Sequence, residues 1–175
     1  MKRPLRKETT CCFTGPRPPR LPCGGALNTP EMKTLKAALH DAVSDAYADG
    51  YRFFMSGMAN GFDLLAAEEV LRMKNEGAEL YLVAVFPYAG AESHHDPATR
   101  DRIRQILSQS DLTLYLENDY QPQCELRRNI YMVDASYRII GYYNGLSSGT
   151  AHCWNYAVRQ HLELVNLYEE NYSEH

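Results

Sequence analysis

A short proline-rich segment, Thr14-Gly15-Pro16-Arg17, combines a glycine with an arginine directly after an apolar run. A glycine at this point lets the backbone approach a ligand closely, and Arg17 offers a planar fork of donors that suits phosphate or carboxylate. A turn with a surface arginine is the plainer alternative. The surrounding prolines restrict the backbone and favour the binding role for Gly15 and Arg17.

A second segment, Ser56-Gly57-Met58-Ala59-Asn60-Gly61-Phe62-Asp63, stands between an apolar run and a helical pattern. Backbone N–H groups at the start of a helix bind anions. The spacing fits neither a Walker A loop nor GxGxxG, so spacing alone is a weak signal. Asp63 has two equal readings: it binds a ligand hydroxyl, or it belongs to a helix cap in which Asn60 is the N-cap.

A third segment, Asn144–Thr150, opens a helix with small hydroxyl residues and glycine. Ser148, Gly149 and Thr150 suit the oxygens of a phosphate, and an ordinary Ser or Thr N-cap is the plainer alternative. Two such loops in one chain, each at the end of a predicted strand, argue more strongly for phosphate binding than either does alone.

Two further groups of polar residues give weaker signals. Arg128, Asn129 and Asp134 interrupt an amphipathic helical pattern, and from the residues alone a solvated helix face is the more frequent explanation. The run His94-His95-Asp96 does not predict a metal site, because adjacent histidines point apart and no HExxH partner is present. We identify no catalytic residue, since the chain also lacks a GxSxG nucleophile elbow.

Short apolar runs alternate with helical patterns along the chain and must position these loops. The predicted strands are Cys11–Thr14, Arg52–Ser56, Glu79–Phe86, Leu112–Leu116 and Arg138–Tyr143, with Leu162–Tyr168 as a further candidate. The alternation predicts an α/β protein, a Rossmann-like three-layer α/β/α fold with a mostly parallel sheet. In such sheets ligands bind outside the carboxyl ends of the strands, where all three loops would lie.

The helical patterns carry recognisable starts and buried stripes. Thr29 is the predicted N-cap of the first helix, and Pro30 suits its first position. Later helices are predicted over Gln123–Ser136 and Gly149–His161. The last of them is predicted to bury one face made of Ala151, Trp154, Val158 and His161.

Length and composition set the remaining limits. The 175 residues suit one domain, which we place at residues 10–170, between a flexible basic tail at 1–9 and a short tail at 171–175. The net charge of −4 argues against a general nucleic-acid or membrane binder. The odd count of cysteines without a CxxC pair, and the lack of a signal peptide, predict a reduced, cytoplasmic protein.

The segments TGPRP, SGMANGFDLLAAE, RRNIYMVDAS and SSGTAHCWNYA, taken in order, resemble the YpsA-like branch of the SLOG superfamily, which is related to the DprA and LOG Rossmann-like proteins. The resemblance implies a nucleotide or nucleotide-derived ligand at the strand ends, with no certain cofactor. By position, it implies these ligand-binding residues: Gly15, Arg17, Ser56, Gly57, Met58, Gly61, Asp63, Arg128, Asn129, Asp134, Ser148, Gly149 and Thr150.

The chain departs from the LOG enzymes at one position that matters for catalysis. The LOG loop GGxGTxxE carries a glutamate that takes part in N-glycosidic cleavage, and here Cys153 occupies its place, while Ser148 replaces a glycine. A thiol is not an equivalent acid or base at neutral pH, so the resemblance argues against LOG-type phosphoribohydrolase activity.

Three functions remain open. The first is a sensor or regulatory protein that binds a phosphate-bearing, nucleotide-like small molecule. The second is a hydrolase or transferase acting on such a molecule, with Asp63, Asp134 or Glu68 as candidate carboxylates. The third is a DNA-binding or protein-interaction module, which the charge balance disfavours. We also expect a homo-oligomer, because tyrosine is abundant and the domain is small.

Overall fold

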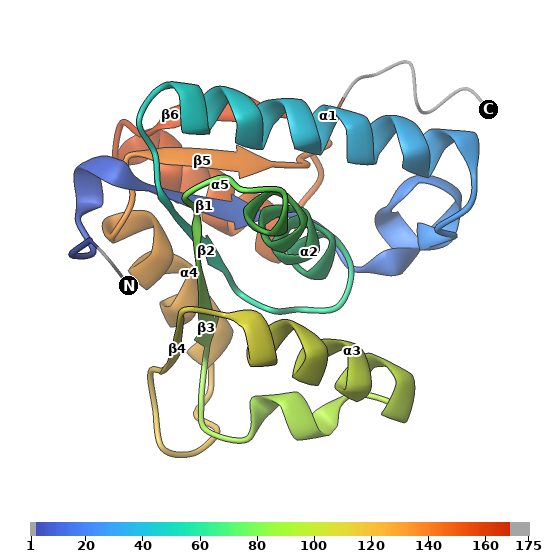
Figure 1. Cartoon of the computed structure of the whole chain (residues 1–175). Coiled ribbons are helices and arrows are strands. Elements are labelled where there is room, and N and C mark those ends of the chain that lie inside the picture. The colour runs from blue at the N-terminus through green and yellow to red at the C-terminus, as the bar shows by residue number, and fades with distance from the viewer. Residues whose placement is uncertain (1–2, 169–175) are drawn as a thin grey trace.

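The computed structural model describes residues 3–168, and its centre is a six-stranded sheet in which every neighbouring pair runs parallel (Figure 1). The strand order is β4-β3-β2-β1-β5-β6. The strands are β1 (Thr10–Thr14), β2 (Phe53–Ser56), β3 (Tyr81–Phe86), β4 (Leu112–Tyr115), β5 (Arg138–Gly141) and β6 (Glu163–Asn166). This is the predicted α/β fold of Rossmann-like type.

Helices cover both faces of the sheet. The five α-helices are α1 (Pro30–Ala48), α2 (Phe62–Asn75), α3 (Pro97–Gln109), α4 (Cys124–Asp134) and α5 (Gly149–Arg159). Helices α1, α2 and α3 pack on one face, where they contribute Leu35, Leu64 and Ile103 to one core cluster. Helices α4 and α5 pack on the other, with Met132 and Trp154 in a second cluster. The three-layer α/β/α arrangement is therefore confirmed.

The burial of the strands explains their sequences. Every residue of β1, β2 and β3 is buried, which requires the near-continuous apolar runs that predicted them. The edge strands β4 and β6 are part-exposed or exposed, and β6 begins and ends with the polar residues Glu163 and Asn166. Their shorter apolar pattern made β6 the least certain strand from the sequence.

The order in which strands are added to the sheet changes side at β1, although all strands stay parallel. From β1 it proceeds outward through β2 and β3 to β4, and then returns to place β5 and β6 on the opposite side of β1. The pairs Cys12↔Met55 and Cys12↔Ile139 show that β1 has a parallel neighbour on each side. The crevice between the carboxyl ends of β1 and β5 is therefore the topological switch point, where ligands bind in folds of this type.

Helix starts follow local side-chain chemistry. Thr29 caps α1 as predicted, because its Oγ1 accepts a hydrogen bond from the Met32 N–H at 3.3 Å. Of the two alternatives for Asp63, the helix cap with Asn60 as N-cap is wrong: the N-cap of α2 is Gly61, which has a φ of +106°. The Asp63 carboxylate accepts instead from the Ala59 N–H at 3.3 Å, outside a capping box.

The predicted buried face of α5 was partly wrong. Ala151 and Trp154 are buried, but Val158 is 45% exposed and His161 lies beyond the end of the helix. The helix ends at Arg159, and its buried stripe runs through Cys153 and Ala157. Residues three and four positions apart, counted from Thr150, form this buried stripe. Val158 lies outside the stripe and faces solvent.

Several predicted elements are shorter in the structure. Helix α4 begins at Cys124 and ends at Asp134, because Gln123 adopts a left-handed φ of 63° and Ala135 ends the helix. Strand β5 ends at Gly141. The connection between β3 and α3 contains a short 3-10 helix, η4 (Ala91–His94), and α3 begins at Pro97.

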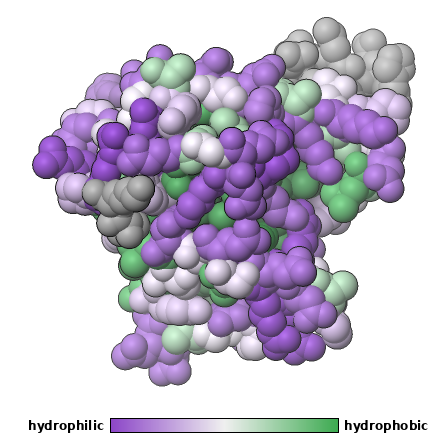
Figure 2. Space-filling model, viewed as in Figure 1, coloured by the Kyte–Doolittle hydropathy of each residue, from purple (hydrophilic) through white to green (hydrophobic). Residues whose placement is uncertain are grey.

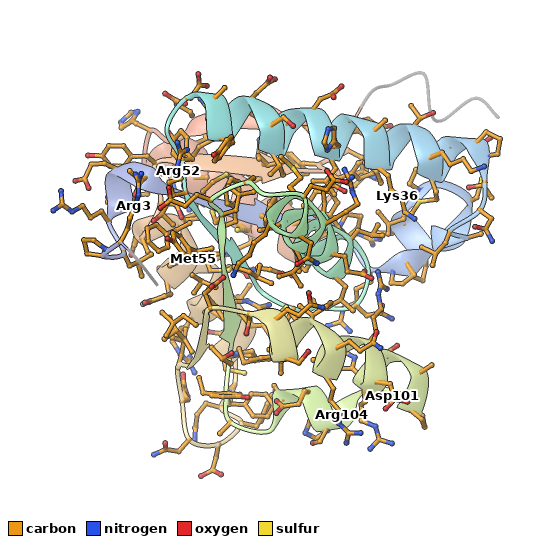
Figure 3. The ribbon with its side chains drawn as sticks, viewed as in Figure 1. Arg3, Lys36, Arg52, Met55, Asp101 and Arg104 are labelled. Carbon is orange, nitrogen blue, oxygen red and sulfur yellow. The ribbon has the colours of Figure 1, made fainter. Side chains whose placement is uncertain are left out.

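The described part of the N-terminal segment lies against the domain. Arg3 forms an ion pair with Glu79 at 2.9 Å, and the Thr10 hydroxyl donates to the Arg6 carbonyl at 2.6 Å (Figure 3 labels Arg3). The predicted tail at 171–175 lies outside the described residues.

The surface over α1, α2 and α3 is mostly hydrophilic. In Figure 2 the apolar areas on this face are small and separated. Within residues 3–168, no helix combines the length and the apolar character needed to cross a bilayer.

Candidate functional site

A cavity of about 290 Å³ opens at the switch point between β1 and β5. The loops that follow β1, β2 and β5 all reach it, together with the first half of α4. The predicted anion-binding segments therefore converge on one place, although they are far apart in the sequence.

The loop after β1 is held against the start of α2 by close backbone contacts. The Pro16 carbonyl accepts a hydrogen bond from the Phe62 N–H at 3.1 Å. A Cβ on Gly15 would lie 2.3 Å from the Phe62 ring, and one on Gly61 would lie 2.5 Å from the Pro16 oxygen. Both glycines therefore permit close approach of the two segments, and this fixes the direction in which Arg17 leaves the loop.

The loop after β2 is braced by Ser56. The buried Ser56 hydroxyl donates to the Asp63 carbonyl at 2.9 Å and accepts from the Met58 N–H at 3.2 Å. Met58 adopts a left-handed φ of 57°, which turns the chain sharply. Ser56 thus shapes the loop from behind, and its side chain does not line the cavity.

Arg128 and Asp63 form the charged inner wall. Arg128 is only 7% exposed, and its Nη1 donates to the Gly57 carbonyl at 2.6 Å. Its Nε donates to the Asn129 side-chain oxygen at 2.9 Å. Asp63 is 6% exposed, and burial raises its pKa to about 6, against the lowering effect of Arg128 and then Arg17. With a pKa of about 6 the carboxyl is still mostly ionised at pH 7, and its negative charge falls away only as the pH drops through about 6.

The start of α5 forms the opposite wall. The Ser148 side chain accepts a hydrogen bond from the Ala151 N–H at 3.1 Å and caps the helix. The N-cap, one of the two roles that the sequence suggested for this residue, is therefore confirmed. Gly149 has open space around it. Because the first N–H groups of a helix have no partner within it, Gly149 and Thr150 can present donors and the positive end of the helix dipole.

Two arginines of the first loop lie at the mouth. Arg17 Nη2 is 3.7 Å from the Glu125 carboxylate, and both side chains are well exposed, at 66% and 59%. Such an ion pair contributes little, so Arg17 can exchange Glu125 for a ligand at small cost. Arg20 donates to the Ser147 carbonyl at 3.3 Å and links the loops that follow β1 and β5.

The predicted ligand residues divide into three groups by place. Eight line the cavity: Gly15, Arg17, Asp63, Arg128, Asn129, Ser148, Gly149 and Thr150. Gly57 and Met58 line an adjoining hollow of about 150 Å³, which Arg17 and Arg128 also border. Ser56, Gly61 and Asp134 line neither.

Asp134 lies apart because α4 carries it away from the strand ends. It is exposed at the last residue of α4, and its Oδ1 accepts from the Tyr156 hydroxyl at 2.6 Å. Arg128 sits nearly two turns earlier and faces the cavity. The family resemblance placed both residues in the site, whereas the geometry brings only Arg128 there.

Sequence reasoning missed several lining residues. They are Phe13, Thr14, Pro16, Pro19, Arg20, Ala59, Glu125 and Leu126. Most belong to the loops that were already singled out, so extending each segment by a few residues would have included them. Glu125 gave no such signal, because only its position at the start of α4 brings it opposite Arg17.

Cys153, which stands at the position of the LOG glutamate, is buried behind this wall at 1% exposure. Burial raises the pKa of its thiol to about 11. It is therefore a neutral thiol at physiological pH, and it does not line the cavity.

Other hollows and clusters do not match this arrangement. A larger hollow of about 450 Å³ lies between α1 and α2, but most of its charged side chains pair with one another, as in His40–Glu69 at 2.7 Å. Within residues 3–168, no three His, Cys, Asp or Glu side chains are grouped as metal ligands would be. His94 and His95 instead border the 150 Å³ hollow.

The fold and the cleft at its switch point define a Rossmann-like α/β protein with a binding site at the strand ends. The sequence profile of the YspA SLOG family matches residues 11–170, and the chain belongs to that family. This confirms the resemblance seen in the four sequence segments.

Individual relatives are more distant. The chain is 24% identical over 149 residues to the "Uncharacterized SPbeta prophage-derived protein YoqJ" of Bacillus subtilis (strain 168), a match that covers 78% of this chain and 87% of that protein.

Among solved structures, DNA processing protein A (DprA) from Streptococcus pneumoniae superposes with a TM-score of 0.59 at 13% identity, covering 88% of this chain and 49% of that one. DprA from Helicobacter pylori, whose structure is described for its single-stranded DNA binding mode, superposes with a TM-score of 0.59 at 19% identity. This match covers 89% of this chain and 64% of that one. The protein TM1055 superposes with a TM-score of 0.54 at 13% identity, and the match covers 89% of this chain and 71% of that one. The chain thus spans about half to two-thirds of the DprA chains, and these likenesses show the fold alone.

Proposed function

We propose that this protein binds a nucleotide or nucleotide-derived small molecule through its phosphate, in the cleft between β1 and β5, as a sensor or regulatory protein. The observation that carries the proposal is the convergence on one cavity of Arg17, Arg128 and the start of α5. These groups come from three separate parts of the chain, and each is a phosphate-binding element in its own right.

The charge balance inside the cleft favours an anion. Arg17 is exposed and held only by a weak ion pair, so it is free to bind a phosphate oxygen. Arg20 adds a second guanidinium at the mouth. Of the two carboxylates on the walls, Asp63 has a pKa raised by burial, and Glu125 can be released when Arg17 binds the ligand.

A hydrolase or transferase is the second candidate, and Asp63 is the observation in its favour. Of the three candidate carboxylates, Asp63 alone borders the cavity. Glu68 is paired with Arg102 on the α2–α3 side, and Asp134 is bonded to Tyr156. An enzyme of this design would use a buried carboxyl with a pKa of about 6 as its acid or base.

Single-stranded DNA binding is the third candidate, because a structural neighbour has that property in its description. The net charge of −4 and the enclosed cleft favour a small ligand instead. Self-association and a cytoplasmic location both stay predictions. Size-exclusion chromatography with light scattering would test whether the protein forms a homo-oligomer.

The testing experiment is a thermal-shift and calorimetric screen of the purified protein against nucleoside monophosphates, dinucleotides, ADP-ribose, ribose 5-phosphate and a short oligothymidylate. A ligand at a hundredfold excess over its dissociation constant stabilises the fold by about 2.7 kcal/mol. We expect a shift with phosphate-bearing small molecules, and loss of about 1.5–3 kcal/mol of binding free energy in Arg17→Ala.

The matched control is Arg104→Ala. Arg104 lies on α3 (Figure 3), is 72% exposed and borders neither the cavity nor the adjoining hollow. Equal affinities of the Arg17 and Arg104 variants would refute the assigned site. A response to the oligonucleotide alone would favour the DNA-binding candidate.

A further inference from the structure

We infer that the 150 Å³ hollow beside the cleft is a subsite for a flat ring, so that the base of a nucleotide lies there while its phosphate lies in the larger cavity. The inference rests on the proposed function and assigns the base-recognition residues, which come largely from the loop that follows β3. None of that loop was among the candidate ligand residues.

The two hollows are parts of one cleft. Arg17, Ala59, Glu125 and Arg128 border both of them. A ligand that contacts the guanidinium groups of Arg17 and Arg128 therefore stands at the junction, with space on either side. The phosphate of such a ligand would lie in the larger cavity. A base attached to the same sugar would extend from the junction into the smaller hollow.

The smaller hollow has the walls that a flat ring requires. Phe86, Tyr88, His94 and His95 border it, with the Met58 side of the β2 loop opposite. Aromatic and imidazole rings of this kind stack with nucleobases of any sequence. Both hollows share Arg17 and Arg128, and the larger cavity adds Arg20 and the start of α5. The two ends of the cleft thus differ in chemistry as the two ends of a nucleotide do.

The ring-bearing loop is held in place by its own contacts. The Tyr88 ring meets the His94 ring at 5.9 Å and the Tyr120 ring at 5.6 Å, both edge-on. Phe86 is stacked on Tyr115 at 5.2 Å. Rings fixed in this way lose little freedom when a base stacks on them, which favours binding.

His95 is suited to stacking as a neutral ring. Burial lowers its pKa, and the neighbouring Arg17 lowers it further. The imidazole is therefore uncharged at neutral pH, and the positive charge of the cleft stays with the arginines.

Size supports the same division. The larger cavity alone, at about 290 Å³, lies just below the range of about 300–1,000 Å³ that small-molecule sites occupy, and the hollow of about 150 Å³ brings the whole cleft into the lower part of that range.

The test compares AMP with ribose 5-phosphate, which carries the same sugar and phosphate without the base, by calorimetry on the full chain. Ala91→Phe fills the smaller hollow, which Ala91 borders, and Ala89→Phe is its matched control on the exposed side of the same loop. His95→Ala is a second variant that removes a ring without adding bulk.

We expect AMP to bind the wild-type protein about tenfold or more tightly than ribose 5-phosphate. Ala91→Phe and His95→Ala should weaken AMP binding by a similar factor and leave ribose 5-phosphate unchanged, while Ala89→Phe changes neither. If AMP binds no better than ribose 5-phosphate, or if the variants affect both equally, the ring subsite is wrong and the phosphate site stands. If neither probe binds and the wider screen is also silent, the proposed function itself fails.

Discussion

The Arg128 guanidinium donates to the Gly57 carbonyl at 2.6 Å, a contact that ties the middle of α4 to the loop after β2. The approach is so close that a Cβ on Gly57 would lie 2.8 Å from the Arg128 Cζ and 2.9 Å from the Asp63 Oδ2. Gly57 therefore contributes to the cleft by leaving room for two buried charged side chains, Arg128 and Asp63.

Replacement of that glycine should disturb both stability and binding. We expect Gly57→Ala to lower the free energy of unfolding by about 1–3 kcal/mol, because Arg128 or Asp63 must move to admit the methyl group. Urea denaturation measures the change. Gly149→Ala is the control, since a Cβ there meets no other atom within 4 Å, and a loss of stability as large in this variant would contradict the explanation.

Asp63 should make stability depend on pH in a defined window. Its pKa is about 6 in the folded protein against 3.8 without the fold, so between these values the folded state holds a proton that the unfolded state has lost. Folding is therefore favoured at low pH, and this contribution is lost as the pH rises through about 6.

In Asp63→Asn that contribution is absent. We expect the free energy of unfolding of the variant, relative to the wild-type protein, to rise by at most about 3 kcal/mol between pH 4 and pH 6.5. Parallel urea titrations at several pH values would show it. A difference between the two proteins that stays constant over this range would mean that the carboxyl is not buried as described.

Ser148 should matter more as a helix cap than as a bulky residue near the phosphate. We expect Ser148→Ala to cost about 1 kcal/mol of stability, because the bond to the Ala151 N–H is lost. Ser148→Gly, which restores the glycine of related loops, should cost only a few tenths of a kcal/mol of stability. Thermal or urea unfolding distinguishes the two, and equal losses would argue against the cap.

Asp134 and Asn129 give a direct contrast within one helix. Asn129 borders the cavity and accepts a hydrogen bond from Arg128, whereas Asp134 is exposed and bonded to Tyr156. We expect Asn129→Ala to weaken the binding of whichever ligand the screen identifies by about 1 kcal/mol, and Asp134→Asn to leave it unchanged. Calorimetry measures both, and the reverse order would restore Asp134 to the site.

The alternation of apolar runs and helical patterns was enough to predict the fold, because strands buried on both faces need continuous apolar sequence. The strand order was not accessible in the same way. Nothing local in Leu112–Tyr115 or Glu163–Asn166 says that these strands occupy opposite edges of the sheet.

The site was predictable where loop chemistry carried it, as for Arg17 and Gly149. It was not predictable where only three-dimensional packing decides. His95 looked like half of an unlikely metal pair, and it borders the cleft because the β3 loop folds back toward α4. Asp134 and Arg128 share a sequence segment, but the turn of the helix separates them.

The central position of β1 also bears on the order in which the protein can be made. Cys11 pairs with Arg138, and the loops after these two strands form opposite walls of the cleft. Closing so long a stretch of chain is slow and entropically costly, so contacts of this kind tend to form late in folding. On a ribosome, β1 emerges well before β5, and its pairing with β5 must wait until β2, β3 and β4 have been made. A product that stops after β4 therefore lacks α4, β5 and the start of α5, and with them one wall of the cleft.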